Sequence, residues 1–164
     1  MTTGAAIAAR GGLAASAWMV LSSVLFWVLS SLLIGLLANR VPERWLQAGG
    51  APRQHTRRWE PPGIRLWKRW IPDAGPALPG GIAKASLVRR DPAALGRLLL
   101  ETRRAALVHR VLWAAGLVTA LWLPPAGVAV NLLFATAFNL PCLLLQGHNR
   151  RRLLGCLARL QASQ

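Results

Sequence analysis

The stretch from Glu101 to His109 contains the densest set of side chains that could do chemistry. If it is helical, Glu101 and Arg104 are three residues apart and can form an ion pair, and Thr102 and His109 share one face. Histidine titrates near neutral pH, so His109 could act as a general base toward a hydroxyl group. A purely structural interpretation is also open, in which Glu101 balances arginines and His109 satisfies a backbone group at a membrane surface.

A second polar set lies toward the C-terminus and consists of Asn131, Asn139, Gln146, Asn149 and Arg150. Amide side chains inside a membrane cost free energy unless they face other helices. Spacings of eight and seven residues put Asn131, Asn139 and Gln146 along one side of a helix. We expect Asn131 to form hydrogen bonds between helices, whereas the segment 139–150 brackets the same membrane depth as His109.

Other catalytic and metal-binding patterns are missing from the sequence. Cys142 and Cys156 are fourteen residues apart and match neither a metal site nor a convincing disulfide. The three histidines form no HxxH or HxxxH pair, and neither a glycine-rich phosphate loop nor a GxSxG motif occurs. The sequence therefore predicts no metal site, and it excludes a histidine-box di-iron enzyme and a hydrolase with a GxSxG nucleophile.

The distribution of charge identifies the elements that must position these side chains. The chain has 164 residues, with 20 Lys and Arg against 5 Asp and Glu, and a formal net charge of +15. Residues 1–39 carry one charged side chain, Arg10, and residues 111–149 carry none. Two uncharged blocks on either side of a basic block indicate an all-α integral membrane protein.

We predict about three transmembrane helices, at 13–38, 105–123 and 126–146. About 20 apolar residues span a bilayer core, so the uncharged segment 13–38 can cross it with some tilt. A cleaved signal peptide, whose apolar run is ~7–15 residues, is the alternative for this segment. The second helix should begin with Asp91 as N-cap and Pro92 as its first residue, and end before the turn at Pro124. Pro141 should kink the third span.

The basic residues predict the orientation of a single membrane domain, 1–164. Lys and Arg are concentrated in segment 40–104 and in a C-terminal helix expected at 149–162, so the positive-inside rule places both in the cytoplasm and the N-terminus outside the cell membrane. Tryptophans among the arginines of 40–104 are typical of an amphipathic segment at the headgroup level, where anionic lipids attract Lys and Arg. Because no nucleic-acid motif accompanies the charge, we expect no nucleic-acid partner.

Beyond the first predicted span, six short motifs follow one another along the chain. They are Arg40-Val41-Pro42-Glu43-Arg44-Trp45; Trp59-Glu60 with Gly63; Trp67-Lys68 with Pro72-Asp73-Ala74-Gly75; Gly80-Gly81 with Lys84; Glu101-Thr102 with Arg104-Ala105 and His109; and Asn139 with Pro141, Gln146 and Asn149-Arg150. In order and spacing these motifs resemble the glycosyl-4,4'-diaponeurosporenoate acyltransferase family, small membrane enzymes of carotenoid glycolipid synthesis. The resemblance implies transfer of a fatty acyl group to a hydroxyl of a membrane glycolipid, such as a carotenoid glycoside.

The resemblance also implies a set of catalytic residues. His109 would take the proton of the attacking hydroxyl, with Glu101 and Arg104 as the other catalytic candidates. Arg104, Asn149 and Arg150 would donate hydrogen bonds to the developing oxyanion or to phosphates of the acyl donor. The donor, an acyl-CoA or an acyl carrier protein, is a co-substrate, and no metal or other cofactor is implied.

Substrate-binding residues are implied on both sides of this catalytic stretch. Lys68 and Lys84 would hold the donor headgroup, and Glu60 or Asp73 would hold the hydroxyls of the acceptor. The full set is Trp67, Lys68, Asp73, Lys84, Asn139, Gln146, Asn149, Arg150 and Glu60. The expected partners are therefore membrane lipids, the glycolipid acceptor, the acyl donor and anionic headgroups, and an oligomer is also conceivable.

One departure from the family pattern leaves a second function open. The family has a glutamate three residues before the histidine, and this chain has Ala106 there. That carboxylate could orient the histidine, so its loss leaves the catalytic pair incomplete. The alternative function is a non-catalytic lipid-binding or partner subunit of a membrane complex that keeps the acyltransferase scaffold.

Overall fold

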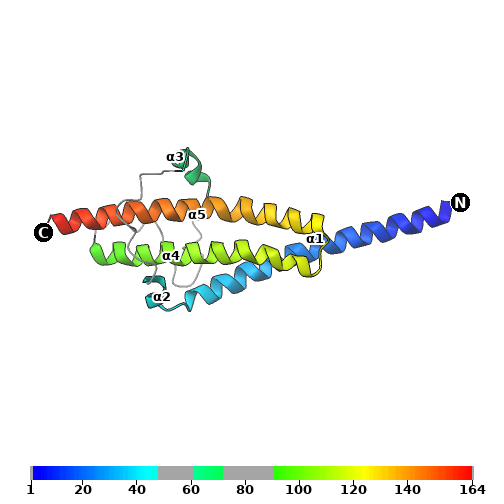
Figure 1. Cartoon of the computed structure of the whole chain (residues 1–164), viewed down its shortest axis with the longest axis horizontal. Helices are drawn as coiled ribbons and strands as arrows, with labels where there is room; N and C mark the ends of the chain where they lie inside the picture. The colour runs from blue at the N-terminus through cyan, green and yellow to red at the C-terminus, as the bar shows by residue number, and fades with distance from the viewer. Residues whose placement is uncertain (1, 48–60, 72–90, 164) are drawn as a thin grey trace.

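The computed structural model describes residues 2–47, 61–71 and 91–163. These residues form helices and no strand, in the order α1 (Thr2–Asn39), α2 (Glu43–Gln47), α3 (Ile64–Trp67), the 3-10 helix η1 (Lys68–Trp70), α4 (Pro92–Ala115), the 3-10 helix η4 (Gly116–Leu121) and α5 (Pro125–Ala162). Figure 1 shows α4 and α5 running antiparallel as a long hairpin, which α1 crosses obliquely. The predicted all-α architecture is confirmed.

Local signals in the sequence set the start and the end of α4. Asp91 is its N-cap: the Oδ1 atom accepts a hydrogen bond from the backbone N–H of Ala93 (3.2 Å), and Pro92 is the first helical residue. The helix tightens into η4 before the turn, where the backbone N–H of Leu123 donates to the carbonyl of Thr119 (3.0 Å). The predicted start of this helix and the predicted turn after it are both confirmed.

α5 is one helix of 38 residues and covers both the third span predicted at 126–146 and the C-terminal helix predicted at 149–162. Three weak helix formers, Gly147, His148 and Asn149, separate the apolar part from the basic part, and the glycine alone costs about 1 kcal/mol inside a helix. At about 1.5 Å per residue, α5 is about 57 Å long. A bilayer core is about 30 Å thick, so the arginine-rich end of α5 would extend beyond it.

Exposed and buried side chains are distributed as in a membrane protein. Large apolar side chains are exposed on all three long helices, for example Leu32 (59%), Trp113 (47%) and Leu133 (71%). Polar side chains such as Asn131 and Asn139 are instead buried between the helices. Exposed apolar side chains with buried polar ones are unfavourable in water and favourable in lipid. In the described part of the chain, three helices are long and apolar enough to cross a membrane: Ala15–Asn39, Pro92–Leu121 and Pro125–Ala162.

α1 contacts the hairpin through small and aromatic residues. Ser22, Ser23, Phe26 and Trp27 recur at helical spacing and are half-buried, whereas the leucines on the other faces of α1 are exposed. Where α1 crosses α5, Asn131 Oδ1 accepts a hydrogen bond from Trp27 Nε1 (2.7 Å), and Asn131 Nδ2 donates to Ser23 Oγ (3.3 Å). The expected interhelical role of Asn131 is confirmed.

Replacing Asn131 by leucine should loosen α1 from the hairpin. Leucine has a similar volume but can neither accept from Trp27 nor donate to Ser23, so two interhelical hydrogen bonds are lost. Such bonds contribute about 0.6 kcal/mol on average and up to about 1.7. We expect SDS titration of the protein in micelles to show unfolding about 1–2 kcal/mol easier. Ser16→Ala is the control, because the Ser16 hydroxyl bonds only the Gly12 carbonyl within α1; equal stability of the Asn131 variant and wild type would contradict the assignment.

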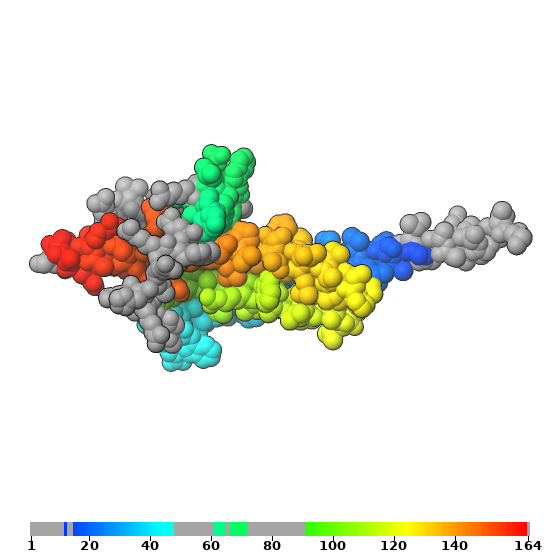
Figure 2. All heavy atoms as spheres, turned by 45° about the horizontal axis from the view of Figure 1, so that its top comes forward, coloured from blue at the N-terminus to red at the C-terminus, as the bar shows by residue number. Residues whose placement is uncertain are grey.

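The end of the hairpin away from the turn has a small leucine core, and two short helices lie beside the hairpin. Leu95 and Leu98 of α4 are buried together with Leu153 of α5. α2 packs against α4, and α3 lies beside α5 on the opposite side of the hairpin (Figures 1 and 2). α2 is held at Arg103 of α4, and the α3–η1 segment lies against residues 140–144 of α5.

Candidate functional site

A histidine and an asparagine face each other between α4 and α5. His109 Nδ1 lies 3.0 Å from Asn139 Oδ1, and Asn139 Nδ2 donates a hydrogen bond to the backbone carbonyl of Ala135 (2.9 Å). Asn139 is 5% exposed, and His109 is half-buried. The fold therefore joins two residues that are thirty positions apart and that the sequence had placed only at a similar depth.

These two hydrogen bonds determine which nitrogen of His109 carries the proton. The amide NH2 of Asn139 is directed to the carbonyl of Ala135, so the amide oxygen faces His109 Nδ1. An amide oxygen only accepts, so Nδ1 donates, and in the neutral form of the ring the lone pair is then on Nε2. If the amide were turned over, its oxygen would face the Ala135 carbonyl, and two acceptors would meet. A neutral imidazole with an available Nε2 is the form that a general base requires.

Further contacts between α4 and α5 hold this pair in register. One turn beyond His109, Trp113 Nε1 donates to Thr136 Oγ1 (3.0 Å). Gly116 then approaches α5 so closely that an added Cβ would lie 3.4 Å from the Cβ of Ala135. A hydrogen bond and a close backbone approach on the same seam resist sliding of one helix along the other. The position of the imidazole therefore follows from the packing of the hairpin.

Asn139 also bears on the glutamate that the family pattern has at position 106. Ala106 lies three residues before His109 on the same helix and carries no polar atom in its side chain. The oxygen that orients the imidazole comes from Asn139 on the facing helix instead. The orientation of the His109 ring therefore does not depend on a carboxylate at position 106.

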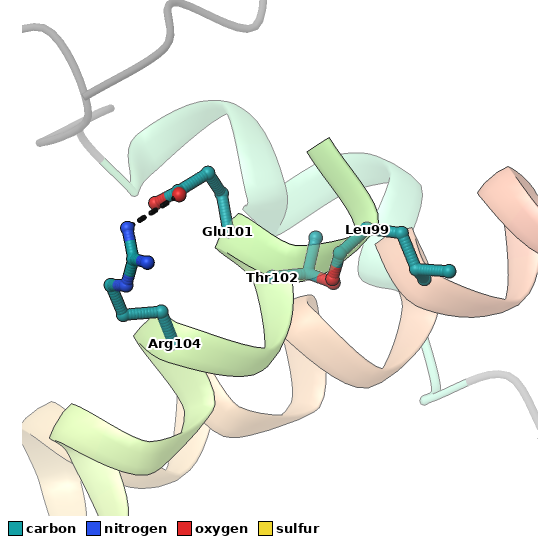
Figure 3. Close-up of polar contacts among 4 residues, drawn as sticks. All are labelled: Leu99, Glu101, Thr102 and Arg104. Atoms are coloured by element: carbon teal, nitrogen blue, oxygen red, sulfur yellow. Dashed lines mark hydrogen bonds and ion pairs between the residues drawn. The ribbon is translucent and has the colours of Figure 1, made fainter. Parts of the chain in front are cut away.

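Glu101 and Arg104 form the ion pair that their spacing predicts, with Arg104 Nη1 donating to Glu101 Oε1 at 2.6 Å. Figure 3 shows both side chains on one side of α4, while Thr102, whose Oγ1 donates to the carbonyl of Leu99 (2.7 Å), lies on another. Among the hydrogen bonds of the described residues, none joins this ion pair to His109. Glu101 and Arg104 thus neutralise each other beside the seam.

Gln146 and Arg150 continue the face of α5 that begins at Asn139. They follow it by seven and eleven residues, at helical spacing, and both are half-buried. The Nε atom of Arg150 is buried, and within the described part of the chain it has no hydrogen-bond partner. Asn149 is half-buried beside them. These side chains lie about two to three helical turns from the imidazole, toward the arginine-rich end of the hairpin.

An apolar groove of about 430 Å³ lies between α5 and the α3–η1 segment. Its lining consists of Pro61, Pro62, Trp67, Trp70, Ile71, Leu140, Pro141 and Leu144. Trp67 is held by a hydrogen bond from its Nε1 to the Pro62 carbonyl (3.0 Å), and Lys68 follows as the first residue of η1. At 3.6 residues per turn, the α5 residues of the lining lie on the face turned away from Asn139, so the groove does not open onto His109.

Sequence reasoning missed several contacts of this region. Arg103 Nη1 donates to the backbone carbonyls of Leu46 (2.8 Å) and Gln47 (3.1 Å), and so ties α2 to α4. Nothing in a single sequence indicates the partner of such an arginine. The hydrogen bond between Trp113 and Thr136 was easier to predict. Trp113 follows His109 by four residues, so the two side chains share one face of the helix. Three predicted substrate-binding residues lie outside the described residues: Glu60, Asp73 and Lys84.

Comparison with known proteins agrees with the order of the motifs. The model of the glycosyl-4,4'-diaponeurosporenoate acyltransferase family matches residues 42–159 of the 164-residue chain. No curated protein and no solved structure matches the chain. The matched segment includes His109 and Asn139 and begins after α1. The chain belongs to the glycosyl-4,4'-diaponeurosporenoate acyltransferase family.

Proposed function

We propose that this protein transfers a fatty acyl group from an activated donor to a hydroxyl of a membrane glycolipid, with His109 as the general base. The observation that carries the proposal is the 3.0 Å contact between His109 Nδ1 and Asn139 Oδ1, which leaves Nε2 free to accept a proton. Membership of an acyltransferase family supplies the reaction class. A carotenoid glycoside is the acceptor that we favour, on the family description.

In the proposed step the O–H bond of the acceptor breaks and its proton passes to Nε2 of His109, while the oxygen bonds to the acyl carbonyl carbon. The tetrahedral intermediate then collapses, and the bond from the acyl carbon to the sulfur of the donor thioester breaks. The leaving thiolate takes the proton from His109. The products are an ester and a free thiol, and the imidazole is neutral again. The donor, an acyl-CoA or acyl carrier protein, is consumed as a co-substrate, and no cofactor takes part.

Arg150 is the residue that we favour for stabilising negative charge on the substrates. Its buried Nε has no hydrogen-bond partner among the described residues, so a donor is available there. The buried Nε of Arg104 also lacks a partner among the described residues, but Arg104 is less suited because Glu101 already neutralises its charge. Asn149 and Gln146 can add amide donors on the same stretch of α5.

The apolar groove and its edge are the proposed site for the lipid part of a substrate. Trp67 lines the groove, and Lys68 beside it would attract an anionic headgroup. The roles proposed for Lys84 toward the donor, and for Glu60 and Asp73 toward the hydroxyls of the acceptor, rest on the motifs alone.

We propose that the protein lies in the cell membrane with the arginine-rich end of the hairpin in the cytoplasm and the N-terminus outside. Trp45 and Trp70 support this placement, because both are exposed and each follows an arginine. The Cζ atom of Arg69 lies 5.3 Å from the centre of the Trp70 ring, a cation–π contact suited to the headgroup region. Anionic headgroups would then be partners of this end, and self-association is compatible with the lipid-exposed helices.

The direct test is an acyl-transfer assay with the full chain in lipid nanodiscs. A panel of acyl-CoA and acyl carrier protein donors is incubated with a glucosylated carotenoid or another membrane glycolipid, and lipids are analysed by mass spectrometry. We expect a product heavier by one acyl group, formed with release of free thiol. Failure of every donor and acceptor to give such a product, in a preparation shown to be folded, would contradict the proposal.

Asn139→Leu should lower the turnover number by about two- to tenfold, since a hydrogen bond that orients the base contributes about 0.5–1.5 kcal/mol. The variant removes the acceptor of the His109 Nδ1–H and leaves the base itself in place. Asn139→Asp keeps an oxygen at this position and should retain more activity than the leucine variant. Steady-state kinetics at saturating donor measure both effects, and the idea fails if the leucine variant turns over like wild type.

The apolar groove favours a second candidate, a non-catalytic lipid-binding subunit, because it is separated from His109 by α5. An acyltransferase depends on His109, whereas a lipid-binding subunit depends on the apolar groove alone. Leu144→Trp would fill the groove, whereas His109→Gln would leave it open. In a lipid-binding subunit the first variant loses co-purified lipid and the second has no effect on any readout; in the enzyme the second variant abolishes product.

A further inference from the structure

Four arginine side chains gather on one flank of the α4–α5 hairpin: Arg103, Arg110, Arg150 and Arg151. The guanidinium of Arg150 is partly desolvated and is repelled by the positive charges of the other three. Arg103 and Arg110 are seven residues apart and so share one face of α4. The carboxylate of Glu101 is engaged by Arg104 instead. In the described part of the chain, no ion pair links a carboxylate to Arg110, Arg150 or Arg151.

Arg103 fixes the place of this cluster relative to α2. Its Nη1 donates to the carbonyls of Leu46 and Gln47 at 2.8 Å and 3.1 Å, so the side chain is held at the end of α2. Arg103 contributes positive charge to the flank, and these two hydrogen bonds hold the end of α2 against α4. The donors for a ligand must therefore come from the other arginines.

The remaining three side chains keep donors available. The buried Nε of Arg150 has no hydrogen-bond partner among the described residues, and a buried guanidinium N–H without an acceptor costs free energy. Arg110 is exposed and Arg151 half-buried, and the hydrogen bonds of the described residues use neither guanidinium. Like charges held together at a partly desolvated place are stabilised when an anion binds among them.

We propose that this flank binds a phosphate group, with Arg110, Arg150 and Arg151 as donors. A guanidinium carries parallel N–H groups that match two phosphate oxygens, and its charge persists at every physiological pH. Two sources share this chemistry: the phosphates of a nucleotide-bearing acyl donor, and the headgroup of an anionic phospholipid. The donor source rests on the proposed function, whereas the phosphate site itself does not. Arg110 follows His109 directly, whereas Arg150 lies about three helical turns farther along the hairpin, so the phosphate would lie between the base and the arginine-rich end of the hairpin.

The first arm of the test uses coenzyme A as the probe, with the full chain in nanodiscs of phosphatidylcholine. Arg150→Gln and Arg110→Gln should each weaken binding by about tenfold or more, because a hydrogen bond to a charged group contributes at least that factor. Arg152→Gln is the matched control: it removes the same charge from the same turn of α5, but Arg152 is exposed and is not among the arginines that act on Arg150. Arg110 is also exposed, so its variant tests the site even if Arg150→Gln does not fold.

The second arm distinguishes the two phosphate sources. Native mass spectrometry of protein exchanged into mixed phosphatidylcholine and phosphatidylglycerol measures how much phosphatidylglycerol is retained. Loss of coenzyme A binding in the Arg110 and Arg150 variants assigns the site to the donor, and loss of phosphatidylglycerol assigns it to a lipid headgroup. Equal binding of both probes by these variants and by Arg152→Gln overturns the proposal. His109→Gln should bind like wild type, so a failure of acyl transfer and a failure of the phosphate site give different results.

Discussion

Replacing His109 with glutamine is expected to lower the turnover number of acyl transfer by about 10²–10⁴-fold, the usual contribution of a general base. The glutamine amide can still donate to Asn139 Oδ1, so the hydrogen bond across the hairpin can be kept. What the variant lacks is a nitrogen that can take the proton of the attacking hydroxyl. Single-turnover measurement of ester formation, with donor and acceptor both saturating, isolates this step.

The matched control for His109→Gln is Trp113→Phe. It removes the Nε1 donor to Thr136 (3.0 Å), a comparable hydrogen bond between the same two helices, one turn away from the imidazole. If the loss in His109→Gln came from weaker helix packing, Trp113→Phe would show it too. We expect the phenylalanine variant to stay within a few-fold of wild type, about the effect of one neutral hydrogen bond. A fully active glutamine variant would remove His109 from the mechanism.

Gly116→Val should have the largest effect on stability, because α1, η4 and α5 meet at this glycine. A Cβ there would lie 3.2 Å from Leu132 Cδ2, 3.4 Å from Ala135 Cβ and 3.6 Å from Trp27 Cη2. The two methyl groups of valine would extend further into the same space. Overpacking of a well-packed contact costs about 1–3 kcal/mol. SDS titration in micelles measures the loss, and the activity of the folded fraction reports whether the register of His109 shifts with it.

Gly155→Val is the control for the glycine substitution. Gly155 lies on an exposed part of α5, and an added Cβ meets nothing within 4 Å. Valine is a somewhat better helix former than glycine, by a few tenths of a kcal/mol, so this variant should be as stable as wild type or slightly more stable. If both variants lose stability equally, the close approach at Gly116 is not what holds the helices together.

The fold was largely predictable because its signals are local. Asp91 and Pro92 mark the start of α4 through one side chain and one missing N–H, and Pro124 marks the turn after it, without help from the rest of the chain. Absence of charge over 111–149 defines the apolar helices in the same direct way. α5 extends past the predicted span at 126–146. The length of an apolar segment predicts only the part of a helix that lies in lipid, and the backbone hydrogen bonds of the helix can continue outside the lipid.

The site was less predictable because it depends on register. The face that carries Asn139 could be read from its spacing to Asn131, but its pairing with His109 requires knowing how far α4 is shifted along α5. That shift is set by the fit of Gly116 against Ala135, a contact between small residues that carries no signal in one sequence. The motifs predict Arg150 as a site residue, whereas its proximity to Arg103, Arg110 and Arg151 depends on how α4 and α5 pack.

The length of α5 has a consequence for which hydroxyls the base can reach. Asn139 lies fourteen residues after Pro125, which is about 21 Å along the helix from the turn. With the turn at one surface of a core about 30 Å thick, His109 would sit about 9 Å below the opposite surface. A sugar dissolved in water does not descend that far, whereas a hydroxyl that is anchored in the bilayer by an apolar tail can be drawn to this level. Bilayer thickness, as much as any side chain, would then determine which alcohols are acylated.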